Sequence, residues 1–364
     1  MKNKISSLQL CAIAYSLILS NNMGITTYIM FHHAEQDSLI SIIIGTILGI
    51  IPLCIYLKLI NKDKNTNIFE KISKIKFGKI INIILVLSII YLTTICYFNV
   101  TNFISSQYLT KTPYIIIALA FIPASIYLLN KGLKVIGRTT FILTIISLIS
   151  VLITIISLIW QVNILNILPI LEQGIKRPII NSIIYVTYNI TPLILLTSIP
   201  MNNIIDKEKF NKRIIITYII SNTIILILFF LIISILGVNL TKLYHYPEYD
   251  ILKKISLVGF VERIESLLSQ RWIFYCFTTT ILGINFIKEY LKFTFKTNNK
   301  KIEKIIIYIL TFTIGISSNY IFKNNTKANI FIYNKLPYMI IITLIILPTI
   351  ILLLTKKKSH NYDN

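Results

Sequence analysis

The sequence predicts an all-α polytopic membrane protein with ten transmembrane helices, and three observations indicate this fold class. Hydrophobic residues make up 55% of the 364 residues and charged residues only 14%, and the mean hydropathy is +0.75. The apolar residues come in blocks of about twenty, the length that a helix needs to cross a hydrocarbon core. Charged or Pro/Asn-rich segments border these blocks. The composition excludes a soluble globular protein, and we expect residues 1–364 to form a single membrane domain.

Apolar runs and their polar borders place the spans along the chain. The first run follows a short basic segment, as in a secretory signal, but it is long and lacks a small-residue cleavage site, so we interpret it as the first helix. An even number of spans puts both ends of the chain on one side. The ten spans are expected at about residues 8–30, 38–60, 79–104, 112–130, 138–160, 179–200, 213–238, 270–291, 302–322 and 336–355.

The distribution of Lys and Arg predicts the orientation. Of the 36 basic residues, 25 fall on the side that holds both termini and 11 on the other. Short translocated loops avoid positive charge, so both termini should face the cytoplasm. The net charge of +22 then reflects basic loops lying against anionic lipid headgroups. It does not indicate nucleic-acid binding, because the basic residues are spread between apolar blocks rather than gathered on one face or tail.

Polar residues interrupt the first and sixth spans near their midpoints. Residues 20–24 read Ser-Asn-Asn-Met-Gly, and residues 188–192 read Tyr-Asn-Ile-Thr-Pro. A buried amide without a partner is costly in a lipid-facing helix, and Pro192 removes a backbone donor. Unwound backbone that lines a cavity explains these residues better than a continuous helix does.

The two interruptions occupy corresponding positions in two halves of five helices. Because five is odd, the halves, at about residues 8–160 and 179–355, must run in opposite directions across the membrane. This pattern predicts a 5+5 inverted repeat whose broken helices 1 and 6 form a substrate site at the midplane. The alternative is two unrelated kinks retained for helix packing.

The second half of span one begins at Gly24, where free amides and the positive end of a helix dipole favour a carboxylate ligand. Hydroxyl groups on spans three and eight lie at similar depth. The alternative for each hydroxyl is a hydrogen bond to its own helix. The expected ligand-binding residues are Ser20, Asn21, Asn22, Gly24, Ile25, Tyr91, Thr94, Tyr188, Asn189, Thr191, Thr278 and Thr279.

All fourteen Asp and Glu residues can be placed in loops or at helix ends. The sequence therefore predicts no intramembrane carboxylate, which argues against a proton pump; sodium coupling through the hydroxyls of residues 278–280 stays open. No cluster of His, Cys and acidic residues has metal-ligand spacing, and the four cysteines are expected to be buried free thiols. Phosphate-loop and nucleophile-elbow motifs are absent from the sequence. We expect no enzyme activity, no metal site and no cofactor.

Residues 239–270 form a long outer loop with apolar residues at three- to four-residue spacing. This spacing predicts one or two amphipathic helices over the outer mouth. They would act as a lid, as a docking surface or as a purely structural cap.

This loop also carries a family resemblance. It contains Tyr246-Pro247-Glu248, Leu252, Ile255, the run Phe-Val-Glu-Arg-Ile-Glu at 260–265, and Trp272. The pattern resembles the B subunit of endospore nutrient germinant receptors, the GerAB-type permeases. Weaker agreement elsewhere covers nearly the whole chain, at Gln9, Thr112-Pro113, Lys131-Gly132 and Leu168-Pro169.

The resemblance implies an amino acid/polyamine/organocation (LeuT/APC-like) permease fold, located in the spore inner membrane. It also implies a complex with an A subunit and a C-subunit lipoprotein, and recognition of a small nutrient such as an amino acid. Permeases of this superfamily usually have small residues at the first break, so the bulkier residues 20–23 predict a narrower pocket, a different ligand or lost binding. The expected coupling loop comprises Tyr246, Pro247, Glu248, Phe260, Glu262, Arg263, Glu265 and Trp272.

The leading hypothesis is therefore a non-enzymatic germinant sensor in which a nutrient binds between spans one, three, six and eight. Closure around the nutrient would bias the receptor complex toward signalling. An ion-coupled amino-acid secondary transporter is one alternative. A scaffold subunit with a vestigial pocket is another.

Overall fold

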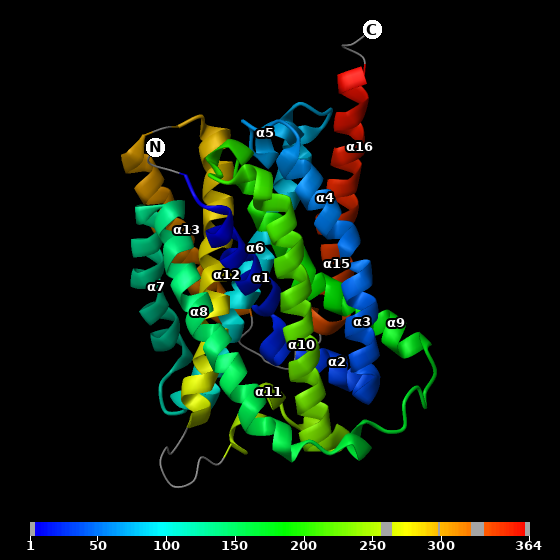
Figure 1. Ribbon diagram of the computed structural model, residues 1–364. Coiled ribbons are helices and arrows are strands. Elements are labelled where there is room, and N and C mark those ends of the chain that lie inside the picture. The colour runs from blue at the N-terminus through cyan, green and yellow to red at the C-terminus, as the bar shows by residue number, and fades with distance from the viewer. Residues whose placement is uncertain (1–3, 256–263, 298, 322–330, 361–364) are drawn as a thin grey trace.

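The computed structural model describes residues 4–255, 264–297, 299–321 and 331–360. Within these residues the fold is built almost entirely from helices, which form one bundle (Figure 1). A single parallel bridge joins Ile5 to Ile204, with Ile5 N–H donating to Asn203 O at 2.9 Å and Ile205 N–H to Ile5 O at 3.0 Å. The expectation of an all-α protein is confirmed.

The first helix is interrupted near its middle, and the chain then turns back. A capping box fixes its start: the Gln9 N–H donates to the Ser6 hydroxyl at 3.2 Å, and the Ser6 N–H donates to the Gln9 side chain at 3.1 Å. The chain reverses direction at Glu35, where φ is 51° (Figure 1). The elements are α1 (Ser7–Leu19), the π-helical turn η1 (Asn22–Thr26), α2 (Thr27–Ala34), the 3₁₀ turn η2 (Glu35–Asp37), α3 (Ser38–Leu48) and α4 (Ile50–Asn61).

Helices make up most of the remaining described chain. The elements before residue 204 are α5 (Ile68–Ser73), α6 (Gly78–Phe103), η3 (Ile104–Tyr108), α7 (Tyr114–Lys131), α8 (Leu133–Leu158), η4 (Ile159–Gln161), η5 (Ile164–Ile167), α9 (Lys176–Tyr185), η6 (Val186–Ile190), η7 (Thr191–Ser198) and η8 (Met201–Asn203). The later elements are α10 (Lys207–Leu243), α11 (Pro247–Leu252), α12 (Ile264–Phe295), α13 (Lys300–Ile321), α15 (Leu336–Ile341), η9 (Ile342–Ile346) and α16 (Leu347–His360).

Eight helical runs among the described residues are long and apolar enough to cross a membrane. Ten spans were expected, and the difference from eight arises at two places in the chain. Residues Ser7–Asn61 form one run, where the sequence predicted two spans, and α12 is not among the eight. The apolar content of α12 is lowered by Thr278, Thr279, Thr280 and Asn285, which are all buried. The count of ten and the inverted repeat therefore stay predictions.

Helix α12 lies at the centre of the bundle, where it packs against α1, α6, α8 and α13 (Figure 1). Gly283 allows α12 to approach α6 closely, because a Cβ at this position would overlap the side chain of Thr93. The central position explains why α12 carries buried hydroxyl and amide groups: its neighbours are protein side chains rather than lipid tails.

The two ends of the bundle carry different features. The start of α1 and the end of α16 lie at one end, and α11 lies at the opposite end (Figure 1). Near the α11 end, Gly237 breaks the regular geometry of α10 with φ of 71°. The nearby carbonyl of Ser234 accepts hydrogen bonds from the Asn166 amide at 2.7 Å and from the Asn163 N–H at 3.2 Å.

The cysteines are free, as expected, but they are not all buried. Cys96 and Cys276 are buried, whereas Cys11 is half-buried and Cys54 is exposed. Their location in apolar helices is compatible with exposure, because a helix surface that faces lipid needs apolar groups as much as the protein core does.

Candidate functional site

The first predicted break is present at residues 20–26. Met23 (φ −67°, ψ 128°) and Gly24 (φ 77°, ψ −19°) leave the helical region, so α1 and α2 are separate half-helices. Carbonyl groups freed by the break are satisfied by the next turn: Thr26 N–H and hydroxyl donate to Asn21 O at 3.0 and 2.8 Å. Thr27 hydroxyl donates to Asn22 O at 2.7 Å. Helix α2 therefore begins at the break with its positive dipole end inside the bundle.

The sixth span changes its winding at the predicted position instead of unwinding. Helix α9 passes into the π-helical η6 and then into the 3₁₀-helical η7 around Pro192. In an α-helix the Tyr188 carbonyl would accept the N–H of residue 192, which proline lacks. Asn21 supplies a donor instead: its Nδ2 atom donates to Tyr188 O at 3.1 Å. The two interruptions are thus bonded to each other.

Asn189 adds a second connection between the interruptions. Its Oδ1 atom accepts the Thr26 hydroxyl at 2.8 Å, and its Nδ2 atom lies 3.5 Å from Asn22 Oδ1. All of these side chains are buried. The Oδ1 atom of Asn21 is buried without a hydrogen-bond partner among the described residues, so the site keeps a free acceptor at its centre.

The outer loop closes the first break from the α11 end. Tyr246 packs so tightly on Gly24 that a Cβ at this glycine would lie 2.8 Å from Tyr246 Cδ1. The Tyr246 hydroxyl accepts the Asn102 amide at 2.8 Å. Glu248 follows on α11, which contacts both η1 and α2, and its side chain is only 4% exposed. The helix that the sequence placed over the outer mouth reaches into the break itself.

Glu248 is a buried carboxyl group that lies outside the candidate membrane spans. By sequence it belongs to a loop, but the fold buries it beside the break. Burial raises its pKa to about 8, while the nearby Thr27 hydroxyl and Gly24 N–H act in the opposite direction. Neither carboxyl oxygen reaches a partner at hydrogen-bond geometry within the described chain. A titratable carboxyl group is therefore buried beside the break, whereas the expectation that no carboxylate lies at the centre of a span stays a prediction.

Helices α6 and α12 complete the surroundings of the break. Asn99 Nδ2 donates to Met23 O at 2.9 Å. Trp272 Nε1 and Cys276 Sγ both donate to Ser20 O, each at 3.0 Å. Every carbonyl from Ser20 to Met23 therefore has a donor from a side chain, and three of these donors lie on other helices.

Several predicted ligand residues lie away from this centre. Tyr91 is 39% exposed, with its ring 6.2 Å from that of Phe331. The hydroxyls of Thr94 and Thr191 donate to carbonyl groups of their own helices. This is the alternative that the sequence left open for such hydroxyl groups. The Tyr188 hydroxyl donates to Ile332 O, so only its carbonyl takes part in the link between the breaks.

The remaining predicted residues divide into three groups. Thr278 Oγ1 lies 3.4 Å from Thr140 Oγ1, whereas the buried hydroxyls of Thr279 and Thr280 lack a partner among the described residues. Ile25 and Pro247 are buried and Glu265 is half-buried. The predicted coupling residues Phe260, Glu262 and Arg263 lie outside the described residues.

The sequence analysis missed Asn99 and Asn102 as site residues. Both carry the signal that identified Asn21 and Asn22, an amide inside an apolar span, and their three-residue spacing places them on one face of α6. The roles of Thr26 and Thr27 were missed as well, because only the backbone of that turn was considered.

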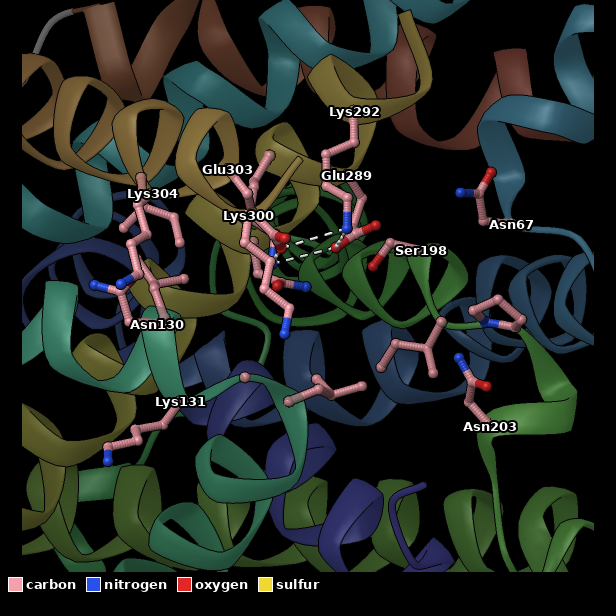
Figure 2. Close-up of a pocket in the computed structure, with 18 of the residues that line it drawn as sticks. Asn67, Asn130, Lys131, Ser198, Asn203, Glu289, Lys292, Lys300, Glu303 and Lys304 are labelled. Atoms are coloured by element: carbon pink, nitrogen blue, oxygen red, sulfur yellow. Dashed lines mark hydrogen bonds and ion pairs between the residues drawn. The ribbon is translucent and has the colours of Figure 1, made fainter. Parts of the chain in front are cut away.

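A cavity of about 560 Å³ is lined by the end of α7, the second half of α12 and the start of α13. These segments lie at the end of the bundle where α1 starts (Figure 1). Figure 2 shows Glu289, Lys292 and Glu303 directed toward one another at the wall of this cavity. Buried Lys288 pairs there with Glu289 at 3.2 Å and with Glu303 at 3.4 Å. In this conformation the start of α11 covers the break, and a charged cavity lies at the opposite end of the bundle.

The broken first helix and the central α12 define a protein with a transporter-type fold. The structure is similar to a solved Na⁺-coupled sialic acid symporter in a substrate-bound outward-open state. The TM-score is 0.64 at 12% sequence identity, and the match covers 94% of this chain and 80% of the symporter chain. This likeness concerns the fold.

The sequence comparisons identify the family. Residues 4–327 match the family model for spore germination proteins, so the chain belongs to the spore germination protein family. YfkT of Bacillus subtilis (strain 168) is 24% identical over 91% of this chain and 90% of its own length. Spore germination protein A2 of the same strain is 26% identical over 57% of this chain and 56% of its own length. Spore germination protein XB of Bacillus anthracis is 24% identical over 80% and 83%.

The expectation of a spore germination protein with a permease-like fold is thus confirmed. The family is one of membrane permease-like proteins and is not a known enzyme family. The eight apolar helical runs within the described residues, together with this family, fit an integral membrane protein.

Proposed function

We propose that this protein is the membrane subunit of a germinant receptor, and that it senses a small nutrient such as an amino acid at the break between α1 and α2. The observation that supports the proposal is the half-helix α2, whose N-terminal end lies inside the bundle beside the amides of Asn21, Asn22 and Asn189. A helix N-terminus favours a carboxylate, and side-chain amides add polar contacts that fix orientation.

The coupling between binding and signalling would pass through the outer loop. Tyr246 packs on Gly24, and its ring lies 6.2 Å from that of Trp272, whose indole bonds to Ser20 O. A ligand that needs the space at Gly24 would displace Tyr246 and so move the start of α11. The ligand can shift the receptor only by its difference in affinity between the two arrangements.

The proposal includes a location and partners. The bias of basic residues supports a cytoplasmic, core-side position for both termini, and family membership supports residence in the spore inner membrane. An A subunit and a C-subunit lipoprotein would be the partners in the receptor complex.

A thermal-stability screen of the purified protein against amino acids, sugars and nucleosides tests the site, because a ligand of the folded state raises its stability. We expect a shift with a small nutrient that is lost in Asn189→Ala and kept in Asn211→Ala, a control at an exposed position. In spores, Asn189→Ala should raise the nutrient concentration needed for germination without preventing receptor assembly. An unchanged dose response would contradict the site.

An ion-coupled amino-acid transporter is the second candidate, favoured by the cavity at the end opposite α11 and by the hydroxyls of Thr279 and Thr280, which have no partner within the described part of the chain. These hydroxyls would supply oxygen ligands for a sodium ion. Accumulation of a labelled amino acid in vesicles that contain the protein supports transport, whereas binding without accumulation supports sensing.

A scaffold subunit with a vestigial pocket is the third candidate. It is favoured by the position of Tyr246, which fills the space beside Gly24. Absence of nutrient binding combined with intact assembly of the receptor complex would support it.

A further inference from the structure

The carboxyl group of Glu248 is the most unusual polar group in the described part of the molecule. It is 96% buried, and both of its oxygens lack hydrogen-bond partners among the residues that the structure describes. None of the ion pairs formed between described residues includes it. A buried charge without a partner is strongly unfavourable, so an ionised Glu248 needs a partner that the described side chains do not provide.

The Gly24 N–H is near the carboxyl group and favours its ionised form, whereas the neighbouring polar side chains are engaged elsewhere. The Thr27 hydroxyl donates to Asn22 O at 2.7 Å. The Asp250 carboxylate, which repels a charge on Glu248, is paired with Lys253 at 2.7 Å. The Arg271 guanidinium donates to Ser150 O at 3.2 Å and to Thr154 Oγ1 at 2.6 Å, toward α8. The missing partner of Glu248 is therefore a hydrogen-bond donor, and its best charge is positive.

Aromatic rings gather around Tyr246, two residues before Glu248. The ring of Phe103 lies 5.1 Å from Tyr246, 5.4 Å from Tyr249 and 4.7 Å from Trp272. His245 stacks between Tyr246 and Tyr28, at 4.6 and 4.9 Å. Ring faces attract cations, and a carboxylate beside a cluster of aromatic rings is suited to an organic ammonium group.

We propose that Glu248 binds the ammonium group of the nutrient, so that the site selects amino acids over sugars, nucleosides and simple carboxylic acids. This assignment rests on the proposed function and adds a specificity-determining residue to it. An ammonium group offers three N–H donors to the two unpartnered oxygens. An amino acid carries its ammonium and carboxylate groups on one carbon, and Glu248 lies near the hydroxyl of Thr27, the first residue of α2. One zwitterion can therefore reach both.

Movement of the Tyr246 ring away from Gly24 would open the space for the ligand. This residue precedes α11 at its N-cap, so displacement of its ring from Gly24 would shift the start of α11 and bring Glu248 against the bound ligand. Once an ammonium group is bound, the opposite charge holds the carboxyl group ionised, which reverses the effect of burial on its pKa.

The test compares the purified full-length protein with two variants. Glu248→Gln removes the charge while keeping the shape, and Asp250→Asn removes a charge two residues away on the same helix. The twenty common amino acids are screened by thermal shift. Each amino acid that responds is then compared with its deaminated carboxylic acid and its decarboxylated amine.

We expect Glu248→Gln to lose affinity for the amino acid by about tenfold or more, as removal of one partner of a buried charge pair does. Asp250→Asn should bind like the wild type. In the wild type, the deaminated acid should bind at least about tenfold more weakly than the amino acid. This last comparison uses only the wild type. It therefore still tests the proposal if Glu248→Gln fails to fold.

Equal affinity of the wild type for the amino acid and its deaminated acid would overturn the assignment. Unchanged binding in a folded Glu248→Gln would also overturn it. Tighter binding in that variant would do so too, because Glu248 would then be a competitor of the nutrient carboxylate. A wild type that responds to none of the amino acids overturns the proposed function together with the assignment, so the two failures are distinguishable.

Discussion

Asn21 donates a 3.1 Å hydrogen bond from Nδ2 to the carbonyl oxygen of Tyr188. The donor lies at the interruption of the first predicted span, and the acceptor lies at the interruption of the sixth predicted span. The acceptor is free because the residue four positions later, Pro192, has no N–H to give. A backbone defect in one helix is thus repaired by a side chain at the defect of another, which ties the geometry of the two interruptions together.

The first prediction concerns this bond. In Asn21→Ala the Tyr188 carbonyl stays buried and loses its donor, which typically costs about 1–3 kcal/mol in the free energy of unfolding. Denaturation in detergent, followed by tryptophan fluorescence, measures the change. Asn211→Ala is the control: Asn211 is exposed and accepts from Asn61 Nδ2 at 2.9 Å, so its loss should cost less than about 0.5 kcal/mol. Equal losses in the two variants would contradict the role of Asn21.

The second prediction separates strain from crowding at Gly24. Gly24 and Gly174 have nearly the same φ, 77° and 78°, but a Cβ at Gly24 meets Tyr246 whereas one at Gly174 meets nothing within 4 Å. Gly174→Ala therefore measures the cost of alanine at positive φ, about 1–2 kcal/mol. Gly24→Ala should destabilise by a further 1–3 kcal/mol or so, as overpacking does. If the two variants lose the same stability, Tyr246 does not press on Gly24.

The position of the first break could be predicted from sequence because its signals are local. Asn21 and Asn22 are amides in an apolar run, and Gly24 takes a conformation that other residues avoid. The same local reasoning would have found Asn99 and Asn102, since the signal is identical. It selected Tyr91 instead, because depth in a span does not reveal which side of a helix faces the bundle.

The burial of Glu248 beside the break could not be predicted from sequence. Its neighbours in the chain place it in a loop outside the spans, and a loop carboxylate is normally solvated. Only the tertiary arrangement brings α11 against α2 and η1. The sixth span shows a similar limit, because Pro192 predicts an interruption but not whether the chain unwinds or tightens into a 3₁₀ helix.

The third prediction uses the pH dependence of stability. Burial raises the pKa of Glu248 from about 4.5 to about 8, so the folded state holds the proton more tightly than the unfolded state does. This contribution to stability is complete below pH 4.5 and is lost as pH rises through 8. His245, whose pKa burial lowers from 6.5 to about 4, acts in the opposite sense, and its contribution is complete above pH 6.5.

Measurement between pH 6.5 and pH 8.5 therefore isolates Glu248. We expect the wild type to lose about 2 kcal/mol more than Glu248→Gln across this interval, at 1.4 kcal/mol for each unit of pH. Asp250→Asn, which removes a carboxylate on the same helix, should keep the wild-type slope. A slope in Glu248→Gln as steep as that of the wild type would show that another group is responsible.

The fourth prediction concerns the carbonyl of Ser20, which Trp272 Nε1 and Cys276 Sγ share as an acceptor at 3.0 Å each. In Trp272→Phe or Cys276→Ala alone the other donor remains, so the carbonyl stays paired. The double variant leaves it buried and unpaired, and should lose about 0.5–2 kcal/mol more than the sum of the single losses. Because both donors lie on α12, such a coupling would show that α12 is joined to the break through this carbonyl. A matched cycle combines Trp272→Phe with Cys96→Ala, whose thiol donates to the carbonyl of Cys276 instead, and its losses should add. Additive losses in the Trp272 and Cys276 cycle would mean that the two donors do not depend on a common acceptor.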